Sequence, residues 1–365
     1  MGLLDFLSFK APEAKVSNEV DVSAALSPLN VSELLRATVR AGVSRQEAMQ
    51  VPTVARARNI ICSTIASLPI EQYNKFTGAH IEPTRVINQP DSRVPGSFTY
   101  AFVAEDLLFL GVSYGQVMSM YADGRIAEWT RIDPSRVVPL YNSNQTEVVG
   151  YQVDSKNVPL SGVGSVICFY GLDEGVLSRA GRTIRAAAAL ETAAEDFALN
   201  PSPQMILKSS GTNLTAERIS KLVTAFNNRK SKSTTFLNAD IDLQAVGLDP
   251  ERLQLNSARQ YVALELCRAL GLPAYFASAE STSMTYSNAI SERKALVDFS
   301  LRSVMLPIEQ RLNQPDFTPN GVENRFDLDD FLRGDPLVRA QTYQILNSIG
   351  AMSVEQIQEE EDLIR

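Results

Sequence analysis

This chain has few of the residues on which metal sites and nucleophilic catalysis usually depend. Its 365 residues include one histidine, His80, and three cysteines, Cys62, Cys168 and Cys267. A zinc site needs several Cys or His ligands at close spacing, and this sequence offers no such set. The cysteines are far apart in apolar segments, which indicates buried, reduced thiols made in a cytosol. His80 follows a Thr77-Gly78 pair and is interpreted as a solvated turn residue.

Nucleotide-binding and hydrolase motifs are also missing or incomplete. Gly175–Thr183 ends without the lysine of a Walker sequence, so no nucleotide-binding loop is predicted there. Gly111–Gly115 matches the G-x-S-x-G pattern, with Ser113 at the place of the nucleophile. That pattern needs a helix after the serine and a later histidine. Here Gln116–Tyr121 alternates as a strand and His80 lies upstream. A Ser/Asp-dependent hydrolase is therefore the less favoured alternative.

No apolar run approaches the length that spans a membrane. The longest, around Leu107–Val112, is interrupted by glycine and polar residues. Met1-Gly2 opens like a myristoylation signal, but Phe6 stands where that signal requires Ser or Thr. We find no secretory signal. The expectation is a protein without a membrane segment, and 365 residues are enough for two or more packed regions.

The charge balance is acidic, with 34 Lys and Arg against 42 Asp and Glu, a net charge of −8. An ordinary DNA-binding surface is basic, so the balance argues against a protein that grips DNA. An acidic surface is compatible with a DNA duplex that slides past it without being bound. The charge also has an ordinary explanation, because many cytosolic proteins are mildly acidic. One acidic cluster could hold a cation or form a solvated face, and its spacing does not match an EF-hand; it comprises Asp327, Asp329, Asp330 and Asp335.

The first half of the chain alternates between helical and strand patterns. Residues 11–50 are polar and mixed, as in an arm. Apolar residues at helical spacing predict helices over Val51–Ser67 and Phe98–Leu110. Alternating residues predict a hairpin turning at Thr77-Gly78 and a β-meander turning at Asp123-Gly124. Further strands are expected over Val148–Val153 and Val163–Tyr170.

A small module interrupts the helices of the second half. An alanine-rich helix is predicted from Ser178, as its N-cap, to Asn200, where two prolines end it. After it come elements typical of a small α/β unit: a strand (Met205–Lys208), a helix capped by Thr215, a basic tip and a hairpin (Thr234–Val246). The sequence thus predicts an α/β insert between two long helices.

The stretch from Asp249 to Asn313 is the most informative. Ala258, Val262, Leu266 and Leu270 form one face of a helix that Gly271 and Pro273 end. The loop Ala277–Asn288 is small and rich in hydroxyls, and a second long helix follows it. Pro307 is expected to bend that helix, because it removes one hydrogen bond and frees the Ser303 carbonyl.

Three segments of this stretch resemble a known family. They read ELCRALGLPAYF, then STSMTYSNA, then LRSVMLPIEQRLN. In this order they resemble the portal proteins of tailed bacteriophages, in the HK97-like family, over about residues 51–350. The residues that match the family pattern are Gly271, Leu272, Pro273, Thr285, Tyr286, Ser287, Asn288, Leu301, Pro307, Glu309, Leu312 and Asn313. Pro307 lies a few residues late, Ala274 stands for a second proline, and Ser113 stands for an asparagine.

The resemblance implies an α+β portal fold with a mixed α/β wing, a two-helix stem, a small α/β clip insert, a tunnel loop with a long kinked helix, and a short helical C-terminal crown. The expected segments are an N-terminal arm (1–50), the first part of the wing (51–177), stem helix one (178–200), the clip (201–248), stem helix two (249–272), the tunnel loop (273–288), the long helix and second part of the wing (289–345), and the crown (346–365).

The resemblance also implies a structural virion protein with no catalytic residue, cofactor or metal. Such proteins form a ring, usually of twelve copies, at one capsid vertex after assembly in the host cytoplasm. The implied partners are double-stranded DNA that passes through the channel, the terminase large subunit, the major capsid protein and a head–tail connector or adaptor, with no membrane. A ring predicts a very large particle, whereas a hydrolase of this length would usually be a monomer or small oligomer.

Two candidate sites follow from the resemblance. The channel-facing loop would comprise Ser278, Glu280, Ser281, Thr282, Ser283, Met284, Thr285, Tyr286, Ser287 and Asn288. The partner-docking tip of the clip would comprise Arg229, Lys230 and Lys232, unless these residues only keep the tip soluble. Two helix faces are expected to pack side by side around the ring and to form its stem. They are the alanine face that includes Ala187 and Ala194 and the apolar face of residues 252–270.

Overall fold

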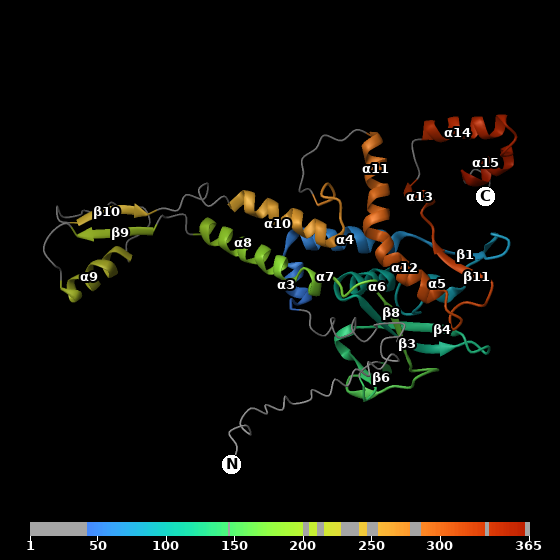
Figure 1. The fold of residues 1–365 in the computed structure, drawn as a ribbon, viewed down its shortest axis with the longest axis horizontal. Coiled ribbons are helices and arrows are strands. Elements are labelled where there is room, and N and C mark those ends of the chain that lie inside the picture. The colour runs from blue at the N-terminus through green and yellow to red at the C-terminus, as the bar shows by residue number, and fades with distance from the viewer. Residues whose placement is uncertain are drawn as a thin grey trace, which may run out of the picture.

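A helix that is largely buried from Thr99 onward, α6 (Gly96–Leu110), lies at the centre of the body of the protein (Figure 1). The computed structural model describes residues 42–144, 147–199, 204–209, 215–227, 241–246, 255–277, 286–332 and 336–361. The sequence of α6 is apolar on most of its circumference, which suits a helix whose second and later turns are buried. Predicted as Phe98–Leu110, this helix is confirmed.

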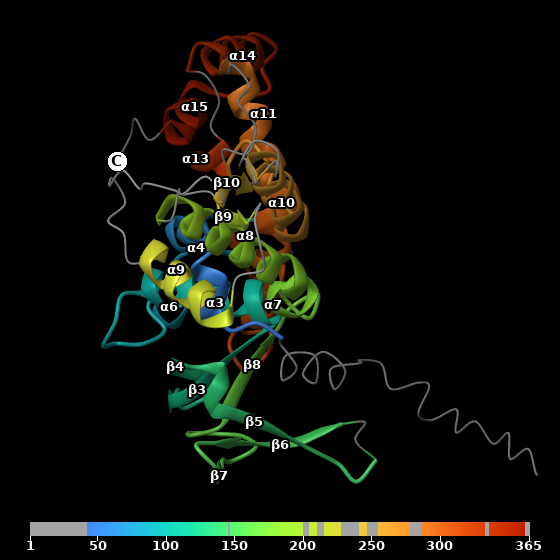
Figure 2. The same ribbon diagram turned by 90° about the vertical axis from the view of Figure 1, so that its left-hand side faces the viewer.

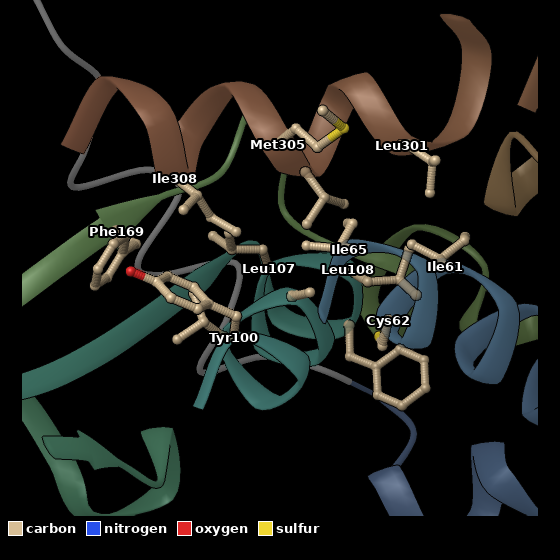
Figure 3. Packing of buried hydrophobic residues seen from close by; sticks show 14 of the residues in the cluster. Ile61, Cys62, Ile65, Tyr100, Leu107, Leu108, Phe169, Leu301, Met305 and Ile308 are labelled. Atoms are coloured by element: carbon tan, nitrogen blue, oxygen red, sulfur yellow. The ribbon is translucent and has the colours of Figure 1, made fainter. Parts of the chain in front are cut away.

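Two further helices pack on α6 and complete the core. They are α4 (Pro52–Ser67), as predicted, and α12 (Arg302–Leu312). Figure 3 shows Ile61 and Ile65 of α4 and Met305 of α12 pointing toward Leu107 and Leu108 of α6. All five side chains are nearly or fully buried. The short helix α3 (Arg45–Met49) precedes α4 and begins with a capping box, in which Ser44 accepts from the Glu47 amide.

One small sheet joins the start of the body to a strand from near the end of the chain. Its order is β11 (Val322–Phe326), β1 (Ile70–Asn74), β2 (His80–Ile81), all antiparallel. The predicted turn at Thr77-Gly78 is confirmed, and Gly78 takes a left-handed φ of 71° there. Helix α5 (Arg85–Asn88) follows β2.

A buried amide network fixes this sheet to the end of α12. Asn324 of β11 is fully buried; its side-chain amide donates to Thr318 Oγ1 (2.8 Å) and to the Leu312 carbonyl (3.0 Å). The side-chain oxygen of Asn324, Oδ1, accepts from Gln72 Nε2 of β1 (2.9 Å). The side chain of Asn313, directly after α12, bonds to the backbone of Asn324. It accepts from the Asn324 backbone N–H (2.6 Å) and donates to the Asn324 backbone carbonyl (3.0 Å). Buried polar groups are stable only when paired in this way.

The remaining strands of the body form two sheets. β3 (Val112–Met120) pairs with β4 (Ile126–Ile132) across the predicted Asp123-Gly124 turn and with β8 (Val166–Tyr170) on its other edge. A second sheet contains β5 (Val137–Tyr141), β6 (Val148–Val153) and β7 (Lys156–Asn157), after the short helix η1 (Pro134–Arg136). The predicted strands are present, but the chain returns to β3 rather than continuing as one meander.

The predicted helix Ser178–Asn200 is two helices. α7 (Val176–Arg179) ends at Ala180, whose φ of −108° is not helical, and α8 (Gly181–Leu199) follows. Ser178 lies inside α7, so its prediction as the N-cap was wrong. α8 runs beside α10 (Leu255–Leu270), and the pair projects from the body (Figure 1); Figure 2 shows the same pair end-on, with α4 against one side.

A separate small module lies between α8 and α10 in the sequence. Strand β9 (Gln204–Ser209) pairs antiparallel with β10 (Ile241–Val246), and helix α9 (Ala216–Asn227) begins after Thr215, as predicted. The predicted hairpin covered residues 234–246. Its second part, β10, pairs with β9, and residues 234–240 lie outside the described residues. The module is drawn at the far end of the helix pair (Figure 1).

The long helix near the C-terminus bends, but upstream of the predicted place. α11 (Tyr286–Leu296) continues into a π-helical turn, Val297–Leu301, where the Arg302 N–H bonds to the Val297 carbonyl, and then into α12. Figure 1 shows the change of direction at this turn. Pro307, where the bend was predicted, lies further along the chain, inside α12. A π turn inserts one extra residue, which reorients the following helix without a proline.

Three short helices complete the chain after β11. They are α13 (Asp329–Leu332), α14 (Pro336–Ser348) and α15 (Val354–Glu360). The three predicted buried cysteines are all buried and free of disulfides. Within the described ranges, no helix has both the length and the apolar character that crossing a bilayer requires.

Candidate functional site

The predicted channel loop begins at a well-defined helix end. α10 stops in a Schellman motif: Gly271 has a left-handed φ of 64°, its N–H bonds to the Arg268 carbonyl (3.3 Å), and the Leu272 N–H bonds to the Cys267 carbonyl (2.9 Å). A Cβ atom at position 271 would lie 2.9 Å from the Phe299 carbonyl oxygen. Only glycine fits this position without strain.

Side chains from three other elements hold the chain on either side of this turn. Ser300, in the π-helical turn, donates to the Gly271 carbonyl (2.6 Å). Arg179 of α7 donates to the Ala269 carbonyl (2.7 Å), and Arg56 of α4 donates to the Phe276 carbonyl. The backbone that enters the loop is therefore fixed to α4, α7 and the long helix.

The structure shortens the predicted loop. Tyr286, Ser287 and Asn288 form the first turn of α11 and are not loop residues. The other predicted loop residues lie outside the described residues; they are Ser278, Glu280, Ser281, Thr282, Ser283, Met284 and Thr285. Their role in facing a channel stays a prediction. Arg229, Lys230 and Lys232 of the predicted docking tip also lie outside the described residues, between α9 and β10.

The acidic cluster has a structural use. Asp327 Oδ1 accepts from the Asp329 amide (2.8 Å), which forms an Asx turn directly before α13. Asp335 lies outside the described residues. In the part of the chain that the structure describes, no group of three or more His, Cys, Asp or Glu residues is arranged to hold a metal ion.

Ser113 lies in a buried ion-pair cluster and not at a nucleophile elbow. It is in strand β3, has no exposed surface, and donates to Asp106 Oδ2 of α6 (2.8 Å). Arg131 of β4 donates to both oxygens of Asp106 (2.7 and 2.6 Å). Burial raises the pKa of Asp106 to about 6, against the opposing effects of Arg131 and Ser113. The strand after Ser113 agrees with the sequence-based rejection of a hydrolase.

The neighbouring carboxylate, Glu105, is held by two arginines from outside α6. Arg45 of α3 and Arg58 of α4 both donate to it. Burial alone would raise the pKa of Glu105, but the Arg45 hydrogen bond and the charge of Arg58 lower it below its ordinary value. Arg58 and Arg131 also lie over the Phe102 ring, 5.7 and 5.2 Å from its centroid. Sequence analysis missed this cluster, although two adjacent acids inside an apolar helix are a visible signal.

The α8–α10 pair packs within the chain. Leu266 and Leu270 of α10 and Ala187 of α8 are buried in the core, and Arg259 of α10 pairs with Glu191 of α8 (2.7 Å). The apolar faces predicted to pack side by side in the stem therefore contact each other within one chain, whereas their contact with neighbouring copies stays a prediction. Beside the pair, a groove of about 430 Å³ lies between α8, α10 and the first turn of α4.

The sequence profile of the family described as "Phage portal protein" matches residues 52–362. This chain belongs to the phage portal protein family. A curated relative, described as a probable portal protein of Streptomyces phage phiC31, is 22% identical over 351 residues, which cover 88% of this chain and 76% of the relative. The predicted resemblance is confirmed, and the portal protein is a structural component rather than an enzyme.

Solved portal structures have the same fold. The crystal structure of an HK97-family phage portal protein from Corynebacterium diphtheriae is similar with a TM-score of 0.63 and 25% identity, over 80% of this portal chain and 99% of that one. A chain in the neck of a native gene transfer agent particle, computed with C12 symmetry, is similar with a TM-score of 0.53 and 16% identity, over 86% of this chain and 89% of that one. The latter likeness concerns the fold alone.

Replacing Gly271 with alanine tests the fixed loop base. Gly271→Ala is expected to lower the free energy of unfolding by about 1–2 kcal/mol for the left-handed backbone, plus the cost of moving the Phe299 carbonyl. Gly78→Ala is the matched control, because Gly78 has a similar φ of 71° but nothing within 4 Å of an added Cβ. Urea unfolding of both variants measures the difference, and equal losses would contradict a tight contact at Gly271.

Proposed function

We propose that this portal protein forms a ring of twelve copies at one capsid vertex and that viral DNA passes through its central channel during packaging and ejection. The observation that carries the proposal is the family match over residues 52–362. The arrangement supports it, because a projecting helix pair bears a small module and the base of a polar loop is fixed beside that pair. In this proposal the protein is part of the virion and assembles in the host cytoplasm.

The proposed parts follow the predicted segments, with the boundaries of the structure. The stem is the α8–α10 pair, and the clip is the module of β9, α9 and β10. The wing consists of the sheets and helices around α6, with α11 and α12 as its long bent helix. The crown, predicted from residue 346, starts inside α14 in the structure. The arm, predicted as residues 1–50, is shorter than predicted, because Val43 and Ala48 are buried in the core of the body. The major capsid protein would contact the wing.

The loop of residues 278–285 is proposed to face DNA. Its side chains are mostly hydroxyls and small groups, with Met284 as a bulky residue and Glu280 as the only charge. Hydroxyls exchange weak hydrogen bonds with successive phosphates and carry no fixed positive charge that would retain the duplex. Because the backbone at Gly271 and Phe276 is held by Ser300 and Arg56, the loop would move relative to a fixed base.

The clip tip is proposed to dock the terminase large subunit and later the head–tail connector or adaptor. Arg229, Lys230 and Lys232 follow α9 directly and gather three positive charges on a short segment of an otherwise acidic chain. Such charges raise the rate and specificity of docking to acidic surfaces more than they raise affinity.

The ring itself is tested on the purified full-length chain. Light scattering after size exclusion is expected to give a particle of about twelve chain masses, and negative-stain microscopy is expected to show rings with a central opening. Copy number follows from the angle between neighbouring interfaces, so closely related ring sizes still support the proposal. A monomer or dimer at every concentration would contradict it.

Lysine in the loop is expected to slow DNA without affecting assembly. Ser281→Lys with Ser283→Lys adds two charges that attract phosphates, so packaging and ejection slow while rings form normally. The matched control is Ser281→Asn with Ser283→Asn, which adds bulk without charge. DNA packaged per head over time is the measurement. Unchanged rates in the lysine variant, or a ring structure with this loop on its outer surface, would refute the role.

Reversing the tip charges is expected to weaken docking only. In the triple variant Arg229→Glu, Lys230→Glu, Lys232→Glu, rings should form, while binding of terminase and adaptor should weaken most at low salt, where charge attraction is strongest. Lys221→Glu, on exposed α9 of the same module, serves as the control. Normal packaging and tail attachment by the triple variant would leave the tip with a solubility role alone.

A further inference from the structure

The exposed ring of Tyr261 stands out on the stem. Tyr261 lies in the middle of α10 with 61% of its surface exposed. An aromatic side chain at such a place contributes large apolar area once it is covered, and tyrosine is enriched among the residues that dominate binding energy at interfaces. Within the chain, the described contacts leave its ring uncovered.

The groove beside α10 has the character of a receptor for such a ring. It encloses about 430 Å³, and three of its lining residues are alanines, Ala187, Ala263 and Ala277. Leu190, Val262 and Leu266 add apolar surface to its walls. Protein interiors are normally close-packed. The small alanine side chains leave this groove unfilled within one chain, so a large side chain of another copy has room to enter it.

Tyr261 and this groove lie on opposite sides of α10. The groove is lined by Arg259 and Ala263, each two residues from Tyr261. At 3.6 residues per turn, a step of two residues rotates by about 200°, so the two side chains lie about 160° apart around the helix axis. One copy therefore cannot place its Tyr261 in its own groove, whereas it can offer Tyr261 to one neighbour and its groove to another.

The polar residues around both surfaces suit this contact. On the Tyr261 side, Glu265 and Arg268 follow at four and seven residues and pair with each other. On the groove side, Glu191 pairs with Arg259. Each side thus contributes a neutral ion pair, so the contact buries no unpaired charge. The Glu191 carboxylate and the Thr53 hydroxyl at the groove can accept from the phenol, which needs a partner once it leaves water.

We infer that Tyr261 of each copy docks into the groove between α8, α10 and the first turn of α4 of the next copy. The contact uses different surfaces on its two sides, and repeated contacts of this kind close into a ring or continue as a filament. The inference rests on the proposed ring and names the residues that join its subunits. The groove is then an interface rather than a site for a small ligand.

Cross-linking provides a directional test on the full-length chain. The double variant Tyr261→Cys, Thr53→Cys is oxidised under mild conditions, at a protein concentration high enough for rings to form without the Tyr261 side chain, and its products are separated on a gel without reductant. The expected result is a ladder of covalent species from dimer up to the full ring, because every copy offers one cysteine to each neighbour. Each single variant is expected to give no ladder, since Cys62, Cys168 and Cys267 are buried. Intact rings that yield no cross-link, or only dimers, would overturn the inference.

Assembly measurements on point variants complete the test. Tyr261→Ala is expected to require at least about tenfold more protein for ring formation in a dilution series followed by light scattering. Tyr261→Phe should lie between this variant and the wild type, since it keeps the ring and loses the hydroxyl. Phe76→Ala, at the tip of the β1–β2 hairpin and 88% exposed, is the matched aromatic control and should assemble normally.

The outcomes separate this inference from the proposed function. A wild-type chain that forms no ring at any concentration contradicts the proposed function. Wild-type rings that Tyr261→Ala forms equally well contradict the docking of Tyr261 and leave the proposed function intact. Tyr261 is exposed, so unfolding by the alanine variant is not expected; if it nevertheless fails to fold, the cross-linked ladder decides the question.

Discussion

The arrangement of the body depends on the burial of two adjacent carboxylates in the central helix. Glu105 and Asp106 are at most 5% exposed, inside a helix that is otherwise apolar. A buried charge without a partner costs several kcal/mol, so α6 is stable only where arginines reach it. Those arginines come from three different elements: Arg45 of α3, Arg58 of α4 and Arg131 of β4. The requirement to pair two charges thus selects the packing of α3, α4 and the β3–β4 sheet around one helix. Hydrophobic contacts with α12 then cover the remaining surface.

A second constraint links the ends of the wing. Strand β11 returns to pair with β1, and the Asn324 network attaches it to the end of α12. Everything from β2 to α12, including stem and clip, is therefore an excursion between two strands that meet in one sheet. This topology lets the stem and clip project far from the core while the body stays closed. It also places the long helix beside the loop base, where Ser300 connects the two.

The sequence predicted most elements of the body but not every joint between them. Helical spacing located α4, α6 and α10, and glycine chemistry located the turn at Gly78 and the end of α10 at Gly271. Asn313 matches the family pattern, but the sequence does not show what this residue does. The structure shows that its side chain makes two hydrogen bonds to the Asn324 backbone. The break at Ala180 was not predicted, although Gly181, a residue of low helix propensity, directly follows it. The bend was assigned to Pro307 because a π-helical turn has no sequence signature comparable to proline. Periodicity also cannot tell whether an apolar face is covered by the same chain or by another copy, so it did not show that Ala187 is largely buried within its own chain.

The way in which the helix pair joins the body has a mechanical consequence. α8 leaves the body after α7, and α10 returns to it at Gly271; the Arg179 side chain bridges the two junctions by its bond to the Ala269 carbonyl. A pull on the distant module therefore reaches the body through two helices in parallel and at neighbouring points. Tension along the helix axes is divided between α8 and α10, and because both are pulled in the same direction, the contacts between them, among them the Arg259–Glu191 pair, are not pulled apart. The two helices share the force, so this joint resists tension better than a single helix of the same length would.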